Sequence, residues 1–223
     1  MKRVLPVAAL LIATAASADD EIYSFVEGPL DFALSFSHHE LPLDYGPAHV
    51  DTSVDRASIL WRERYGERLQ LGLIGGYSLL SQTNNPATAG LDLDGYHAGV
   101  SLDLDLVRSS RFDMFFNAVW LYQKVDHADA SQRVTIITRE PDARVGAGVT
   151  VAGVRAYAGA RYGRIDGEQR QSGTVNDTRA IHETRRSGAF GGLELRLDEN
   201  GYVGVIGESG VDRRVGIYFG RVF

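Results

Sequence analysis

The chain has 223 residues, with 23 Lys and Arg against 29 Asp and Glu, and a formal charge of −6. It contains no cysteine, which excludes disulfide scaffolds, thiolate metal sites and cysteine nucleophiles. An acidic chain without a basic stripe argues against nucleic-acid binding. Any function must therefore come from the pattern along the chain.

The N-terminal residues have the three parts of a secretory signal peptide. The basic pair Lys2-Arg3 precedes an uncharged stretch that ends in Ala-Ser-Ala at residues 16–18. This stretch is shorter than the ~20 apolar residues of a membrane-spanning helix. We therefore expect residues 1–18 to be removed by cleavage after Ala18, and residues 19–29 to form a periplasmic leader.

The remainder of the chain alternates between apolar and polar residues. Leu71 and Leu73, for example, are separated by Gly72 and preceded by Gln70. Because successive side chains of a strand point to opposite faces, each such segment has one apolar and one polar face. The pattern predicts ten strands, at residues 30–40, 54–64, 68–80, 92–105, 112–124, 143–151, 154–166, 186–197, 200–208 and 213–223.

The connections between the predicted strands alternate in length. They are short after strands two, four, six and eight, but long and polar after strands one, three, five and seven, as at residues 167–185. This asymmetry is typical of an all-β transmembrane barrel with up-and-down antiparallel strands over residues 30–223. A barrel of eight or twelve strands, instead of ten, is the alternative for the number of strands. A soluble exported barrel, with the apolar faces inside, is the alternative in architecture.

The last residues resemble the C-terminal signature of bacterial outer-membrane β-barrel proteins. A terminal Phe223 follows alternating apolar residues at Val215, Ile217 and Phe219. Arg221 departs from the usual apolar residue, although an arginine near the membrane interface can extend its charge into water. The resemblance implies recognition by the barrel-assembly machinery and a place in the outer membrane of a Gram-negative bacterium, in contact with lipid and lipopolysaccharide.

The polar faces carry charges of both signs, which we expect to form a polar network inside the barrel. Small barrels of about eight strands are filled by side chains, whereas open channels appear at about sixteen. A salt-bridge network is therefore the first interpretation, and a narrow ion path is the alternative. The predicted members are Arg56, Arg62, Arg64, Asp103, Asp105, Asp113, Arg144, Arg161, Glu194 and Arg196.

Histidines at the outer rim are the weak candidates for chemistry. His38 and His39 are adjacent, so they point to opposite faces and are poorly placed to share a metal. His127 and His182 lie near acidic residues in the two longest predicted loops. Rim-sited outer-membrane proteases of the omptin type place Asp and His residues there to activate water, but the paired motifs of that family are not matched. The His-x-Ser order of outer-membrane lipid A deacylases is not matched.

Taken together, these features predict a monomeric, non-enzymatic protein of the cell envelope without a cofactor. Its role is expected to be structural, surface-exposed or adhesive, or that of a narrow pore. A membrane-embedded hydrolase that uses rim residues is the alternative.

Overall fold

The computed structural model describes residues 29–45, 48–88, 90–129, 131–174 and 176–223. The predicted signal peptide, its cleavage site at Ala18 and residues 19–28 of the leader lie outside these residues. No helix in the described part of the chain is long and apolar enough to cross a membrane. The regular elements are β1 (Leu30–Tyr45), β2 (Ala48–Tyr65), β3 (Leu69–Thr83), β4 (Asp92–Arg108), β5 (Phe112–Ala128), β6 (Gln132–Val151), β7 (Val154–Gly173), β8 (Asp177–Arg196), β9 (Gly201–Gly210) and β10 (Arg213–Val222).

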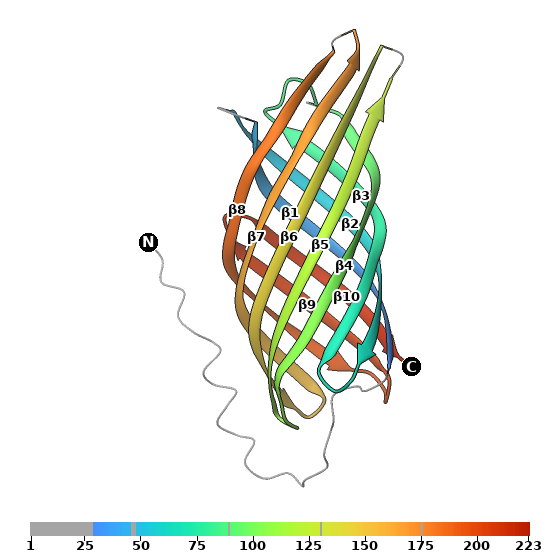
Figure 1. Cartoon of the computed structure of the whole chain (residues 1–223), viewed down its shortest axis with the longest axis vertical. Coiled ribbons are helices and arrows are strands. Elements are labelled where there is room, and N and C mark those ends of the chain that lie inside the picture. Colours follow the sequence, from blue (N-terminus) through green and yellow to red (C-terminus); the bar gives the residue numbers. More distant parts are fainter. Residues whose placement is uncertain (1–28, 46–47, 89, 130, 175) are drawn as a thin grey trace.

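These ten strands form a closed antiparallel barrel (Figure 1). Each strand pairs with its neighbours in the chain, and β1 closes the ring against β10, with Phe36 opposite Ile217. The backbone N–H of Phe223 donates to the carbonyl of Leu30 at 2.7 Å, so the barrel begins and ends at the same edge. Closure satisfies the backbone groups that an open sheet edge would leave unpaired in lipid. The prediction of a ten-stranded all-β barrel is confirmed.

The two ends of the barrel differ. At one end, the turn end, the strands are joined by residues 66–68, 109–111, 152–153 and 197–200. The two-residue turn Ala152-Gly153 has positive φ at both positions, as a tight hairpin requires. The opposite end, the extended end, carries the upper parts of β5 to β8 in Figure 1.

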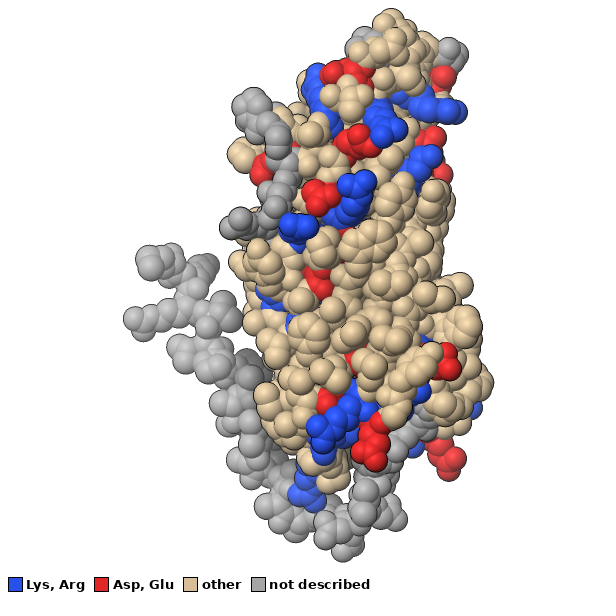
Figure 2. All heavy atoms as spheres, in the orientation of Figure 1, with Lys and Arg blue, Asp and Glu red and all other residues tan. Residues whose placement is uncertain are grey.

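Around its middle, the barrel exposes apolar side chains. Leu71 and Leu73 of β3 are 42% and 57% exposed, and Val100 and Trp120 lie beside them on β4 and β5. Aromatic rings border this belt: Phe32 packs against Trp61 and Phe223 near the turn end. Figure 2 shows charged side chains gathered toward both ends, with uncharged residues predominating between them. So large an exposed apolar surface requires an apolar surrounding.

The structure corrects the prediction of long loops at the extended end. β1 continues to Tyr45 and β2 begins at Ala48, while β6 begins at Gln132 and β8 at Asp177. Three of the four expected loops are thus mostly strand, and only residues 84–91, between β3 and β4, remain a long connection. The reason is a change of polarity: in these extensions most outward residues are polar, whereas apolar residues such as Leu43, Ile136 and Ile181 face inward and are buried beside polar ones such as Gln169.

The extended end also has fewer strands. β9 and β10 have 10 residues each, whereas β6, β7 and β8 have 20. Beyond the β9–β10 turn, β1 lies beside β8, and Asp44 pairs with His182. The barrel therefore passes from a ten-stranded section to an eight-stranded section. Eight strands enclose a space that side chains can fill.

An apolar core fills the eight-stranded section. Ile136 and Leu93 have no exposed surface, and Leu43 is 1% exposed. The β3–β4 connection covers this core: Asn85 and Thr88 are buried, and both donate hydrogen bonds to the amide oxygen of Gln82 at 2.8 Å. The buried residues of the core are Leu41, Leu43, Tyr45, Val50, Val54, Leu80, Leu93, Val125, Val134, Ile136, Ile165 and Ile181.

Candidate functional site

The ten-stranded section encloses a cavity of about 570 Å³ that is lined by charged and apolar side chains. Inward-facing residues alternate with the outward belt along each strand, so the polar faces predicted from the sequence line this space. At the turn end, the cavity reaches the exposed residues Ser109 and Ser110. At the other end, its lining includes the buried residues His39 and Arg161. No member of the apolar core lines it, so the cavity ends below the eight-stranded section.

One group of charges closes the cavity beneath the core. Arg56 of β2 donates from Nη2 to Glu140 of β6 at 2.6 Å and from Nε to Gln123 of β5 at 2.9 Å. Beside them, Ser58 and Ser78 each lie with Oγ 2.8 Å from a ring nitrogen of His97. These contacts join β2 to β6 across the interior, and they satisfy polar groups that would be costly to bury alone.

A second group anchors the β9–β10 turn. Asp212 of this turn is 2% exposed, and its Oδ2 lies 2.7 Å from His39 Nε2 and 2.7 Å from Arg161 Nη2. Arg161 also pairs with Glu208, and Arg144 Nη2 forms a second ion pair with Glu208 at 2.8 Å. Since Asp212 holds the turn inside the barrel, β9 and β10 end there. This group therefore marks the passage from ten strands to eight.

Ion pairs nearer the turn end line the cavity wall. Arg62 pairs with Asp31, whose carboxylate also accepts a hydrogen bond from Tyr202 at 2.8 Å. Arg155 Nε donates to Asp113 at 3.0 Å. Arg64 and Arg108 both approach Asp105, at 3.5 and 3.3 Å. Arg196, also predicted for the network, does not line the cavity; it donates to the backbone carbonyls of Asp198 and Glu199 in the β8–β9 turn at 2.9 and 2.8 Å.

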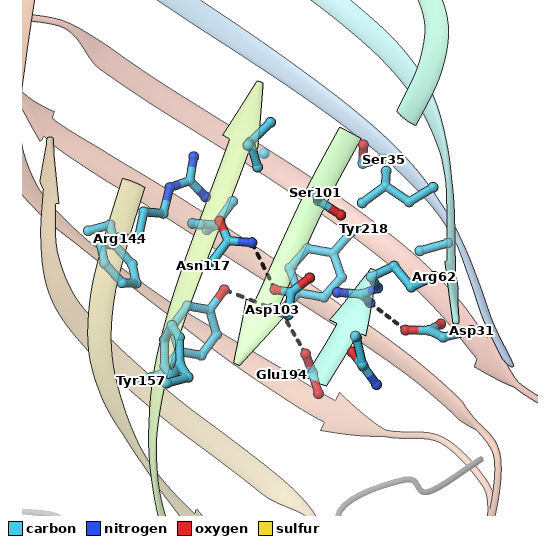
Figure 3. A pocket seen from close by; sticks show the side chains of 18 of the residues that line it. Asp31, Ser35, Arg62, Ser101, Asp103, Asn117, Arg144, Tyr157, Glu194 and Tyr218 are labelled. Atoms are coloured by element: carbon cyan, nitrogen blue, oxygen red, sulfur yellow. Dashed lines mark hydrogen bonds and ion pairs between the residues drawn. The ribbon is translucent and has the colours of Figure 1, made fainter. Parts of the chain in front are cut away.

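Two carboxylates in the cavity wall are held by neutral donors. Asn117 Nδ2 donates to Asp103 at 2.8 Å, and Tyr218 Oη donates to Glu194 at 2.8 Å (Figure 3). Tyr157 Oη lies 3.2 Å from Tyr218 Oη and extends this chain of hydroxyls. The second oxygens, Asp103 Oδ2 and Glu194 Oε1, are buried without a hydrogen-bond partner.

The sequence interpretation named the arginines more completely than their partners. It did not include Asp31, Glu140, Asp142, Glu208 or Asp212, all of which form ion pairs in the lumen. Glu140 and Asp142 lay in a predicted loop, and Asp212 lies in a turn. The sequence indicates that such carboxylates must exist, because each buried guanidinium requires a carboxylate partner, but it does not indicate which ones they are.

The histidines of the rim do not converge. His38 Nδ1 lies 2.7 Å from Asp55 on the outside, whereas His39 faces inward to Asp212. His127 Nδ1 lies 3.0 Å from the backbone carbonyl of Asp92 rather than from a carboxylate. For His182, the structure describes the backbone of β8 but not the side chain. Within the described residues, no three His, Cys, Asp or Glu residues are placed to hold a metal.

The C-terminal signature residues face outward. Val215, Ile217, Phe219 and Phe223 are all exposed on the barrel surface. Arg221, the departure from the signature, places Nη1 3.2 Å from Asp198 Oδ2 in the β8–β9 turn. Its charge is thus matched at the turn end, beside the belt.

Comparison with known protein families and with curated protein sequences finds no match. The fold is similar to that of the translocator domain of the autotransporter NalP from Neisseria meningitidis, with a TM-score of 0.53 and 9% identity over 92% of this chain and 91% of that chain. An outer membrane channel from Pseudomonas putida gives 0.47, with 12% identity over 93% of this chain and 100% of that chain. The transport unit of the autotransporter AIDA-I from Escherichia coli gives a TM-score of 0.44, with 11% identity over 96% of this chain and 95% of that chain. The chain has the fold of outer-membrane β-barrels.

Proposed function

We propose that the protein is a monomeric, non-enzymatic barrel of the outer membrane that conducts no solute and presents its eight-stranded section at the cell surface. The apolar belt supports the location, because an outward apolar band is the lipid-facing surface of such barrels. Closure within one chain supports the monomer, since no second copy is needed to complete the ring.

The apolar core of the eight-stranded section carries the proposal that the barrel is sealed. Leu93, Val125 and Ile136 have no exposed surface, and the β3–β4 connection covers the core from above. Beneath the core, Arg56 and Arg161 occupy the lumen with their ion pairs. A solute would have to displace both layers, so a narrow pore is the less well supported function.

Planar-bilayer recording tests the seal. We expect the purified protein to give no discrete current steps, while its slower or faster migration before boiling in SDS gels shows that it is folded. Regular current steps from the folded protein would contradict the proposal.

Labelling of intact cells tests which section is outside. The chain has no cysteine, so Thr174→Cys at the extended end and Glu199→Cys at the turn end each introduce a single thiol. A membrane-impermeant maleimide should label residue 174 in intact cells and residue 199 only after lysis. The opposite result would reverse the orientation.

The proposal of a non-enzymatic role draws support from the rim. A rim hydrolase needs a histidine that is oriented by a carboxylate and directed toward a nucleophile or water. His38 and His49 each pair with a carboxylate, Asp55 and Asp44, but among the described residues no hydrogen bond joins either ring to a serine or threonine hydroxyl. His127 contacts a backbone carbonyl instead, and His39 is buried in an ion-pair group. Assays with peptide and acylated lipid substrates should give no turnover.

A further inference from the structure

The charges along the cavity are not evenly matched. Near the eight-stranded section, Arg56 is matched by Glu140, and Arg144 and Arg161 share Glu208 and Asp142. Near the turn end, the carboxylates Asp31, Asp105 and Asp113 are each paired with arginine. Asp103 and Glu194 differ, because their hydrogen bonds come from an amide and a phenol.

Asp103 and Glu194 each have one oxygen with free acceptor capacity. Glu194 is 7% exposed, and its Oε1 has no hydrogen-bond partner. Asp103 Oδ2 is likewise a buried atom without a hydrogen-bond partner. An ionised carboxylate accepts up to about four hydrogen bonds. Arg62 lies near enough to act electrostatically on both carboxylates, and Arg155 on Glu194, but neither arginine donates a hydrogen bond to them. A buried acceptor without a donor is costly. Both residues line the cavity, on strands β4 and β8, and Figure 3 shows them facing the same space.

We infer that this cavity is a binding site for a small organic cation whose ammonium group is held by Asp103 and Glu194. An ammonium nitrogen supplies three N–H donors, together with a positive charge, for these two oxygens. Arg62 and Arg155, the arginines near these two carboxylates, are paired with Asp31 and Asp113. Arg214, which lies 3.7 Å from Glu208 and has an unpartnered Nε, is less tightly paired, but it lies at the opposite end of the cavity, beside Glu208 and Arg144. The volume of about 570 Å³ lies within the range of about 300–1,000 Å³ for small-molecule sites.

Entry is from the turn end. Ser109 and Ser110 line the mouth, whereas the other end of the cavity lies beneath buried ion pairs and the apolar core. With the proposed orientation, the cation would come from the periplasm. Only this last statement rests on the proposed function, because the binding site itself does not depend on how the barrel is oriented.

Calorimetric titration of the folded protein in detergent tests the site, with 1,4-diaminobutane as the probe and 1,4-butanediol as its neutral counterpart. We expect saturable binding of the diamine alone. Glu194→Gln and Asp103→Asn remove charge at constant size, and each should weaken the diamine affinity at least tenfold. Glu199→Gln, an exposed carboxylate in the β8–β9 turn, is the matched control and should bind as the wild type does.

Four results would overturn the inference: no binding of the diamine, equal binding of the diol, unchanged affinity in both lumen variants, or displacement of the diamine by equimolar Mg²⁺. The mouth is tested separately with Ser110→Cys. A bulky maleimide on this residue should prevent binding, whereas the same reagent on Glu199→Cys should not. Because these titrations involve no bilayer, a negative result leaves the sealed-barrel proposal intact, and current steps in a bilayer leave a positive titration intact.

Discussion

The ten-stranded and eight-stranded sections use the same alternation of side chains with opposite polarity. In the ten-stranded section, Leu71 faces outward and is 42% exposed, while its neighbour Gln70 lines the cavity. In the eight-stranded section, Ile136 is fully buried, while Arg133 and Thr135 point outward. The surrounding solvent decides which face is apolar. The lower section is built for lipid outside, and the upper section is built like a soluble barrel.

The largest expected effect lies at the junction of the two sections. Arg161→Gln removes the guanidinium shared by Glu208 and Asp212, and it leaves buried carboxylates short of a partner. Loss of one member of a buried ion pair costs about 3–5 kcal/mol. Urea unfolding in lipid vesicles should show a decrease of that size.

Arg164→Gln, on the same strand, is the control. The side chain of Arg164 is half exposed and lies 4.0 Å from Asp166, and exposed pairs contribute about 0–1 kcal/mol. Equal losses of unfolding free energy in the two variants would mean that the junction does not hold the sections together.

Removal of apolar volume should separate the two sections. Leu43→Ala opens a cavity in the core of the eight-stranded section, and substitutions of this kind cost about 2–5 kcal/mol. Leu73→Ala faces lipid, whose chains fill the vacated space, so the loss should be smaller. If Leu73→Ala destabilises the protein in vesicles as much as Leu43→Ala does, residue 73 packs inside a protein core and the belt is misplaced.

Insertion of a charge tests the belt directly. Arginine at the lipid-facing midplane of a barrel costs about 2–4 kcal/mol, whereas lumen positions tolerate charge. Leu71→Arg should therefore reduce the free energy of folding into vesicles by that amount, and Gln70→Arg should reduce it less.

Spin labels on Leu71→Cys and Gln70→Cys give an independent measurement. The label at 71 should relax strongly with oxygen and weakly with a water-soluble nickel chelate. A label at 71 that neither reagent reaches would place it in a packed interior.

The smallest effects are expected in the turns at the two ends. The N–H groups of Asn200 and Gly201 and the nearby Arg221 lower the pKa of Asp198, and Ser131 and Gln132 lower the pKa of Asp129 in the β5–β6 connection. A lowered pKa means that the stabilisation is present above the unfolded value of about 3.9 and is lost as pH falls through the folded value.

Asp198→Ala and Asp129→Ala should each reduce the loss of stability on acidification, measured by urea unfolding below about pH 4. The effect at Asp198 should be weaker in high salt, because Arg221 lies 3.2 Å away and exposed charge pairs are screened. An acid profile identical to that of the wild type would show that these turns do not order the carboxylates.

The prediction of strands was correct where apolar residues alternate with polar ones and the apolar residues face outward. Alternation in residues 69–80 and 112–124 placed Leu71, Met114 and Trp120 on the outward face, and closure of ten such strands followed from the short turns. The prediction of loops at residues 132–142 and 177–185 is wrong, because both segments belong to strands, β6 and β8. There, Arg133, Thr135 and Arg139 were interpreted as loop residues, although they are the water-facing side of strands.

The sequence by itself determined the closed antiparallel barrel, the apolar belt and the arginines of the lumen, because the two-residue period of a strand is local and needs no partner to be recognised. Only the tertiary structure decided where the barrel narrows from ten strands to eight, which carboxylate meets each arginine, and that Asp103 and Glu194 accept their hydrogen bonds from neutral donors. These depend on the stagger of strands distant in the chain. Asp212 lies 173 residues from His39, yet their side chains are 2.7 Å apart, and no local pattern encodes that distance.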